Sequence, residues 1–96
     1  MAVVLVHQGP DVTRESYDKV VRSVLGKDHA ESPSDWPVEG LLVHAAGDSP
    51  DGFRVVDVWE SEAAARRFGE QLAPHMQAAG ITTPPQVYPA YAFVSA

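Results

Sequence analysis

Apolar and polar positions between Gly40 and Gly80 predict a strand, a turn, a second strand and a helix that folds back. Leu41–Ala46 is a short apolar run, and Phe53–Glu60 is rich in Val with a Phe and a Trp, both typical of strands. The six residues between them are dense in Gly, Asp, Ser and Pro, which favour turns. Ser61 is a good helix N-cap, and the Ala-rich stretch after it is a strong helix former.

The first quarter of the chain predicts another strand and helix. Ala2–His7 is almost continuously apolar, as in a central strand covered on both faces. Thr13–Leu25 repeats apolar residues with helical spacing, and Gly26 then supplies the expected left-handed stop. The stripe on this helix comprises Tyr17, Val20, Val21, Val24 and Leu25.

The remaining segments are less regular. Lys27–Glu39 holds two prolines among Asp, Ser and Glu, so we expect a loop with room for one helical turn. Pro74 should kink the second helix or begin another short one. Ile81–Gln86 is an extended connector, and Val87–Val94 is predicted to be a final strand, placed at a sheet edge by Pro89.

This order, β-α-β-β-α-β, predicts an α+β fold of the ferredoxin-like type in a single domain spanning residues 1–96. Both helices then cover one face of a four-stranded sheet. Read with period two, the third strand has Val on both sides and the first strand has no polar face. The bare face would expose about 400 Å², near the largest apolar patch of a typical monomer. We therefore expect a homodimer formed face to face.

Composition narrows the function classes. The net charge is -6 and the seven Lys and Arg are scattered, so no basic patch predicts binding to nucleic acid or to an anionic membrane. The apolar start is too short for a membrane span or a signal sequence. The absence of cysteine is compatible with a reducing compartment. A cytoplasmic protein is the expectation.

The succession GLLVHAAG, then FRVVDVWES and an Ala-rich helix with Phe68 seven residues after Ser61, resembles the dimeric α+β barrel superfamily. Within it, the chain is similar to the antibiotic-biosynthesis-monooxygenase-like (ABM-like) family. The resemblance implies a dimeric barrel with a cavity between each sheet and its helices, and Trp59 lining that cavity. Members include cofactor-free monooxygenases of polyketide-like aromatics, haem-degrading enzymes and cyclases. The chain lacks the Asn of the haem-degrading Asn, Trp and His trio, which argues against that activity.

His44 and Asp57 are the sharpest candidates for chemistry. Asp57 shares a strand side with Val55 and Trp59, so burial would require a partner for its carboxylate. His7, His44 and Arg54 are candidates, as is a local backbone group. An Asp–His pair beside Trp59 could abstract a proton from a phenol or a β-diketone. The alternative is a purely structural ion pair. By strict alternation, His44 lies on the same side as Leu42.

Other residues could join the site or be structural. His75 could reach the cavity from the second helix or be exposed, and His7 could face the cavity mouth. Trp36 is either a plug over the core or a lid on the ligand. Phe68 points inward, and the hydroxyl of Tyr91 could contact a ligand or the ring could be a filler. The four histidines have no metal-ligand spacing, so we expect neither a metal nor another cofactor.

These features predict a small protein that binds a hydrophobic, aromatic or polyketide-like molecule. The activity implied by the resemblance is cofactor-independent oxygenation, in which His44 takes a proton while Asp57 orients it. The alternative is a non-catalytic ligand-binding or stress-type barrel protein. A cavity of a few hundred Å³ with convergent polar groups would favour the enzyme, and a filled interior the structural protein.

Overall fold

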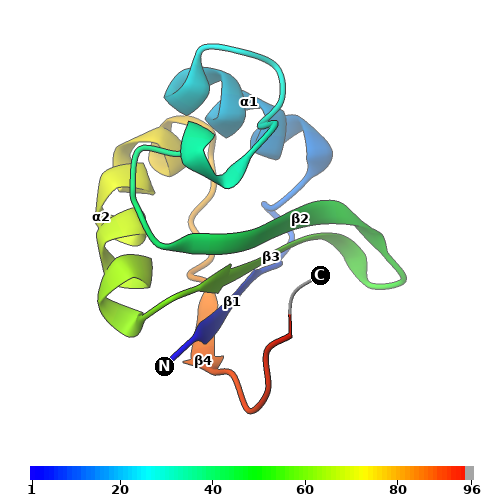
Figure 1. Ribbon diagram of the computed structural model, residues 1–96. Helices are drawn as coiled ribbons and strands as arrows, with labels where there is room; N and C mark the ends of the chain where they lie inside the picture. The colour runs from blue at the N-terminus through cyan, green and yellow to red at the C-terminus, as the bar shows by residue number, and fades with distance from the viewer. Residues whose placement is uncertain (95–96) are drawn as a thin grey trace.

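A computed structural model describes residues 1–94, the side chain of Pro33 excepted. Two helices lie on one side of a four-stranded antiparallel sheet with strand order β2-β3-β1-β4, which is the ferredoxin-like α+β arrangement expected from the sequence (Figure 1). The elements are β1 (Val3–His7), α1 (Arg14–Leu25), a short 3-10 turn (Pro33–Asp35), β2 (Leu41–Ser49), β3 (Gly52–Trp59), α2 (Glu62–Ala78) and β4 (Gln86–Pro89).

Helix α1 begins and ends where its capping residues predict. The Thr13 hydroxyl accepts a hydrogen bond from the backbone N–H of Ser16, and the Ser16 hydroxyl accepts one from the backbone N–H of Thr13. Such a reciprocal cap satisfies two donors that the first turn would otherwise leave free. Gly26 ends the helix at a φ of 71°, a conformation that costs glycine little.

Helix α2 continues through Pro74. Ser61 caps it as expected, accepting from the backbone N–H of Ala64 at 3.1 Å. The helix then runs to Ala78 as one element, so of the two outcomes expected at Pro74, a kink or a second short helix, the second helix is not found. Pro74 lies on the exposed side of α2. The flanking turns are held by the packing of Leu72 and Met76 against the core, which compensates for the missing donor.

The β2–β3 hairpin is longer than predicted and contains a bulge. Pairing continues to Ser49 opposite Gly52, so the six-residue turn shrinks to residues 50–51. Near the other end, Leu41 pairs with Trp59 but Val43 pairs with Val58, which leaves Leu42 as an extra residue. A bulge shifts the alternation by one position. Leu41 and His44 therefore face the same side, and the placement of His44 beside Leu42 is wrong.

Strand β4 is shorter than predicted. It covers Gln86–Pro89 and pairs with β1 at the sheet edge, as Pro89 requires, whereas residues 90–94 leave the sheet. The predicted continuation of this strand to Val94 is therefore wrong. In Figure 1 this last segment extends from the end of β4 on the side away from the helices.

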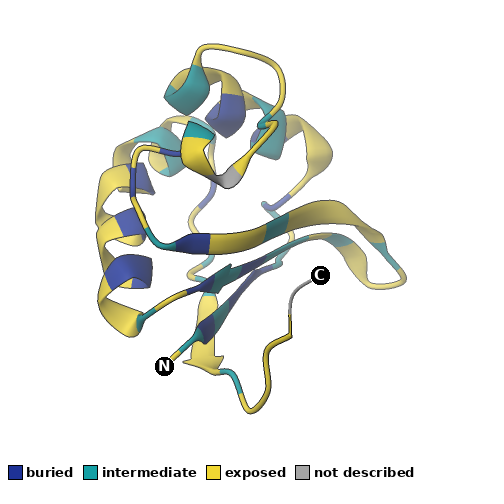
Figure 2. Cartoon of the chain, viewed as in Figure 1, coloured by how far each residue is buried: buried dark blue, intermediate teal, exposed yellow. Residues whose placement is uncertain are grey.

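The core lies between the helices and one face of the sheet, where Figure 2 shows buried residues on the facing sides of both layers. Trp59 at the end of β3 is fully buried against Phe68 of α2, with ring centroids 4.7 Å apart. Gly40 lets the chain enter β2 at a φ of 106°, and a Cβ there would lie 2.9 Å from the Cβ of Ala64. A larger residue at position 40 would therefore push β2 away from α2.

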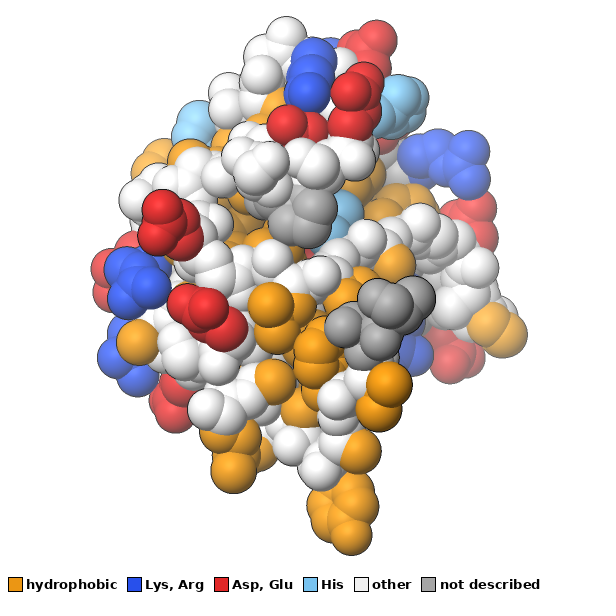
Figure 3. Space-filling view, viewed as in Figure 1, with side chains coloured by type: hydrophobic (Ala, Val, Ile, Leu, Met, Phe, Trp, Pro, Cys, Tyr) orange, Lys and Arg blue, Asp and Glu red, His pale blue; other side chains and the backbone are white. Residues whose placement is uncertain are grey.

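The opposite face of the sheet is apolar and has no helix over it, although Val6 on this face is only 6% exposed. Four neighbouring strands contribute one row of side chains, Val43, Val58, Val4 and Tyr88, and the next row is Ala45, Val56, Val6 and Gln86. Val43 and Tyr88 are 37% and 45% exposed. Figure 3 shows hydrophobic side chains gathered below β2, whereas charged ones lie over the helices and the hairpin. The face-to-face homodimer that this surface suggests remains a prediction.

Candidate functional site

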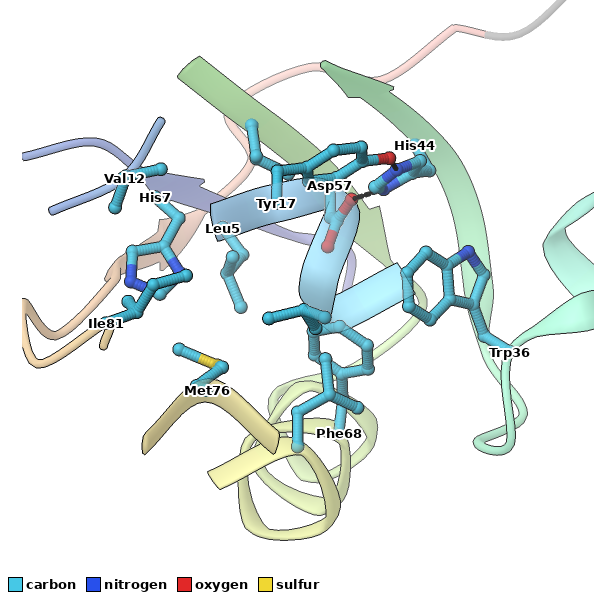
Figure 4. Close-up of a pocket in the computed structure, with 13 residues that line it drawn as sticks. Leu5, His7, Val12, Tyr17, Trp36, His44, Asp57, Phe68, Met76 and Ile81 are labelled. Carbon is cyan, nitrogen blue, oxygen red and sulfur yellow. Dashed lines mark hydrogen bonds and ion pairs between the residues drawn. The ribbon is translucent and has the colours of Figure 1, made fainter. Parts of the chain in front are cut away.

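An apolar cavity lies between the sheet and the two helices, with polar groups at its ends (Figure 4). Its volume is about 50 Å³, enough for a few water molecules or the edge of one ring. Its walls are Leu5, His7, Val12, Tyr17, Val20, Trp36, His44, Val55, Asp57, Phe68, Leu72, Met76 and Ile81. This interior alone is far smaller than the few hundred Å³ expected of an enzyme pocket.

A groove of about 330 Å³ adjoins the interior cavity. The two share Leu5, His7, Phe68, Met76 and Ile81 as lining residues, and the groove continues between α2 and the connector to β4 along Thr82–Pro85. Interior and groove together reach the size of an ordinary ligand site. The space available to a ligand is therefore two-part, with a narrow inner end and a wider outer end.

His44 and Asp57 form the predicted pair at the inner end. They are directly opposite on β2 and β3, and the His44 Nδ1 lies 2.6 Å from the Asp57 Oδ1. The Asp57 side chain is 1% exposed and that of His44 14%. The bulge at Leu42 makes this contact possible, because strict alternation would send the imidazole to the other face.

Tyr17 joins the pair from α1. Its hydroxyl lies 2.6 Å from the His44 Nε2, and the two rings are stacked. Position 17 begins the inward stripe of α1, and this stripe is the signal by which the sequence directs the Tyr17 ring at the core. Burial, and then the charges of Asp57 and Asp18, raise the pKa of Tyr17 above its ordinary value of 10.0. The hydroxyl is therefore protonated at neutral pH.

The hydrogen positions in this chain follow from what each group can do. An ionised carboxylate only accepts, so the Nδ1–H of His44 donates to Asp57. In the neutral imidazole the Nε2 then accepts from the Tyr17 hydroxyl. Tyr17, His44 and Asp57 thus form one directed chain of two short hydrogen bonds, which ends at a carboxylate on the cavity wall. We call it the Tyr–His–Asp chain.

Trp36 closes the side of the cavity next to His44. Its ring lies 5.1 Å from the His44 ring and 5.8 Å from Phe68, and it is buried although it comes from a polar loop. Beside it, Asp35 accepts backbone hydrogen bonds from Glu31 and Ser32 and lies 3.2 Å from the Lys27 Nζ. These contacts lower the pKa of Asp35, the Glu31 bond first, and hold the loop closed over Trp36.

At its opposite end the cavity adjoins the groove, which is lined by the connector around Thr83. The His7 Nε2 donates to the Thr83 carbonyl at 2.6 Å, so His7 lines the cavity while anchoring this segment. Asp11 accepts four hydrogen bonds, from the backbone N–H and the hydroxyl of both Thr82 and Thr83. Gly9 permits this approach, because a Cβ there would lie 2.8 Å from the Thr83 side chain.

The Asp11 bonds make a pH-dependent contribution to stability. Hydrogen bonds from the Thr83 hydroxyl, then from the Thr82 backbone, hold the pKa of Asp11 well below its ordinary value of 3.8. A group whose pKa is lowered by folding stabilises the protein above its unfolded pKa. This contribution is present above about pH 4 and is lost as the pH falls further.

We therefore expect D11N to flatten the acid dependence of stability. The urea midpoint of the wild type should fall between pH 4 and pH 2 more steeply than that of D11N, which should be the less stable protein at pH 7. D51N at the exposed hairpin tip makes the same charge change and should follow the wild type. Equal slopes for wild type and D11N would contradict this role of Asp11.

Three expected site residues lie elsewhere. His75 forms a 2.6 Å hydrogen bond through Nδ1 with Ser23 of α1 and does not line the cavity, because its position on α2 faces α1. Tyr91 is fully exposed beyond β4. Trp59 is on the predicted side of β3 but lies behind Phe68, so Phe68 forms the wall in its place. His7, Trp36, His44, Asp57 and Phe68 are brought together.

Within residues 1–94, no group of three or more His, Cys, Asp or Glu side chains is arranged to hold a metal ion. No helix in this range is both long and apolar enough to cross a membrane.

Comparisons with known proteins give one structural similarity. No protein-family model matches the chain. A search of curated proteins also finds no match. Among solved structures, the fold is similar to a crystal structure of a monooxygenase from the ActVA-Orf6 gene of Streptomyces coelicolor, in complex with the ligand nanaomycin D. The sequences are 24% identical, the match covers 99% of this chain and 91% of the other, and the TM-score is 0.46.

Proposed function

We propose that this protein binds a small hydrophobic, aromatic molecule between its sheet and helices and moves a proton on it through the Tyr–His–Asp chain. The reaction we propose is cofactor-independent oxygenation of a polyketide-like substrate. One observation carries the proposal: a carboxylate that is 1% exposed ends a chain of two 2.6 Å hydrogen bonds on the wall of an apolar cavity. Buried titratable groups coupled in this way are characteristic of functional sites.

The surroundings of the chain suit an aromatic guest. Trp36, Phe68 and Tyr17 present ring surfaces to the cavity, and the remaining walls are mainly aliphatic. Such walls bind a ligand through buried apolar surface area and contacts between rings, whereas the few polar groups orient it. The groove along the connector provides the volume that the interior lacks.

The proposed reaction needs no cofactor because the substrate supplies the electrons. Loss of an acidic C–H or O–H proton leaves an electron-rich carbanion or phenolate that reduces molecular oxygen. For an anthrone-type CH₂ group the balance is one O₂ consumed, one oxygen atom entering a new C=O, and the other leaving as water with the two hydrogens of the CH₂. The protein provides the base and excludes bulk water.

Oxygen uptake tests this activity. Wild-type protein, incubated with anthrone-type and dihydroxyaromatic compounds, should consume oxygen at a rate proportional to protein concentration, and the anthrone-type compounds should gain one C=O per O₂. D57N should lower the rate at least about 100-fold, the usual contribution of a positioned base. D48N, a matched change at an exposed position, should leave it unchanged. Uptake equal to the protein-free rate across the panel would reject the oxygenase.

A non-catalytic binding protein is the second candidate, favoured by the small interior volume. It predicts that aromatic ligands raise the melting temperature without any oxygen uptake. Ligand-induced stabilisation together with absent turnover would assign this function.

We also propose that the sheet face opposite the helices forms a homodimer interface. Val58 lies in the middle of that face, between Val43 and Val4. We expect V58K to weaken dimerisation at least tenfold, because association would bury an unpaired ammonium group. Sedimentation equilibrium measures the effect. Q71K on the exposed side of α2 is the control. A monomeric wild type at micromolar concentration, or a V58K dimer as tight as the wild type, would contradict the proposal.

A further inference from the structure

Within the Tyr–His–Asp chain, the atom that can still accept a hydrogen bond is an oxygen of Asp57. Both ring nitrogens of His44 are engaged, Nδ1 by Asp57 and Nε2 by Tyr17. The Oδ1 of Asp57 is taken by His44, but among residues 1–94 none hydrogen-bonds to Oδ2. Figure 4 shows this second oxygen directed into the cavity, toward the space between Leu5 and Phe68.

We propose that Asp57, through Oδ2, is the group that contacts the ligand, and that it selects molecules carrying a neutral phenolic or enolic hydroxyl. This inference rests on the proposed binding function and names its ligand class. It also inverts the roles expected from the sequence: Asp57 accepts the ligand's hydrogen, and His44 with Tyr17 are positioning residues.

A single hydroxyl matches what the inner end offers. A carboxylate or phosphate ligand would bring a second negative charge beside a buried one, which is strongly unfavourable. An ammonium group has three hydrogens that each need an acceptor. Near Asp57 the polar wall groups other than its carboxylate are His44 and Tyr17, which are already bonded, and the Trp36 indole N–H, which only donates. An aromatic hydroxyl has one hydrogen for one free oxygen, and its ring suits Trp36 and Phe68.

The volumes of the interior cavity and of the groove indicate where the rest of the ligand lies. The interior admits the hydroxyl-bearing edge of a ring, and the body then extends past Phe68 and Met76 into the groove along Thr82 and Thr83. Asp11 and His7 hold that segment in place. Ligands with a hydroxyl at one end of a flat, elongated ring system therefore fit this site.

His44 and Tyr17 act by fixing the orientation of the carboxylate. Donation from the Tyr17 hydroxyl to Nε2 favours the tautomer with the proton on Nδ1, and that proton holds Oδ1. The remaining oxygen is thereby aimed at the cavity. When a bound phenol or enol gives up its proton to Oδ2, the O–H bond breaks, a new O–H bond forms on Asp57, and the electron pair stays on the ligand oxygen.

A series of naphthalene probes tests this selectivity on the wild-type protein. Dissociation constants are measured by isothermal titration calorimetry for 2-naphthol, 2-methylnaphthalene, 2-naphthoate and 2-naphthylmethylammonium. The methyl probe has nearly the shape of naphthol without its donor. We expect 2-naphthol to bind about tenfold more tightly than 2-methylnaphthalene, the value of one hydrogen bond to a charged acceptor. The anion and the ammonium should bind more weakly than either.

The D57N variant tests whether the Asp57 carboxylate is the group that contacts the ligand. Asparagine keeps the shape of the side chain and a partner for His44, but it replaces the charged acceptor by a neutral amide. The naphthol preference over methylnaphthalene should fall at least about fivefold, whereas 2-acetylnaphthalene, a pure acceptor, should gain affinity. D48N makes the same change at the exposed Arg14–Asp48 pair and should keep the wild-type preference. If D57N does not fold, the probe series on the wild-type protein still tests whether the site prefers a hydroxyl.

The outcomes separate the two proposals. Binding of methylnaphthalene as tight as that of naphthol overturns the assignment to Asp57 but leaves the binding function standing. The assignment to Asp57 is also overturned if the naphthol preference survives in D57N and disappears in Y17F. The Tyr17 hydroxyl would then be the group that contacts the ligand. If none of the probes binds, both proposals are overturned.

Discussion

Replacing His44 by leucine should destabilise the folded protein by about 3–5 kcal/mol at pH 7, the usual loss when one member of a buried pair is removed. The imidazole is the one side chain that hydrogen-bonds to Asp57 within residues 1–94, and the Asp57 side chain is 1% exposed. Without it, a carboxylate remains buried among apolar groups. Urea unfolding of wild type and H44L measures the loss directly.

The double variant H44L/D57L shows whether the loss comes from the unpaired charge. Two leucines at these facing positions leave no buried carboxylate, so much of the stability lost in H44L should return. Ser23, the partner of His75, supplies a control: S23A removes an exposed hydrogen bond to a histidine and should cost less than about 1 kcal/mol. A double variant that is no more stable than H44L would mean that the loss in H44L does not come from the unpaired charge.

Trp59 is the second position where a large effect is expected. It is fully buried, so W59A should lose about 3–5 kcal/mol of stability through lost transfer energy and the cavity left behind. W59F should lose much less, because the ring contact with Phe68 is largely kept and the indole N–H has no hydrogen-bond partner among the described residues. Urea midpoints and slopes for the three proteins check this order.

Ligand binding provides a separate readout for Trp59. The residue lies behind Phe68 and outside the cavity, so W59F should retain the naphthol affinity of the wild type within about twofold. A large loss of affinity in a W59F protein that is still folded would restore Trp59 to the cavity wall, where the family resemblance had placed it.

The candidate site was only partly predictable because its geometry depends on a bulge. Asp57 stood out as a charged residue on the apolar side of a strand, and the structure confirms that side. His44 seemed to face elsewhere because Leu41, Leu42 and Val43 are all apolar and carry no sign of the extra residue. Tyr17 was identified only as an inward residue of the first helix, because a helical stripe shows which face is buried but not which strand it meets.

The short range of sequence patterns explains the division between prediction and structure. Hydrophobic periodicity, capping residues and turn formers act within a few residues, so the chain by itself determined the order of its elements and the capped ends of α1. Which residue bulges out of β2, how far α2 continues past Pro74, and which groups meet Asp57 were decided by the tertiary structure. Each of these depends on energies of packing and hydrogen bonding between segments distant in the sequence, and those energies exist only once the segments are in contact.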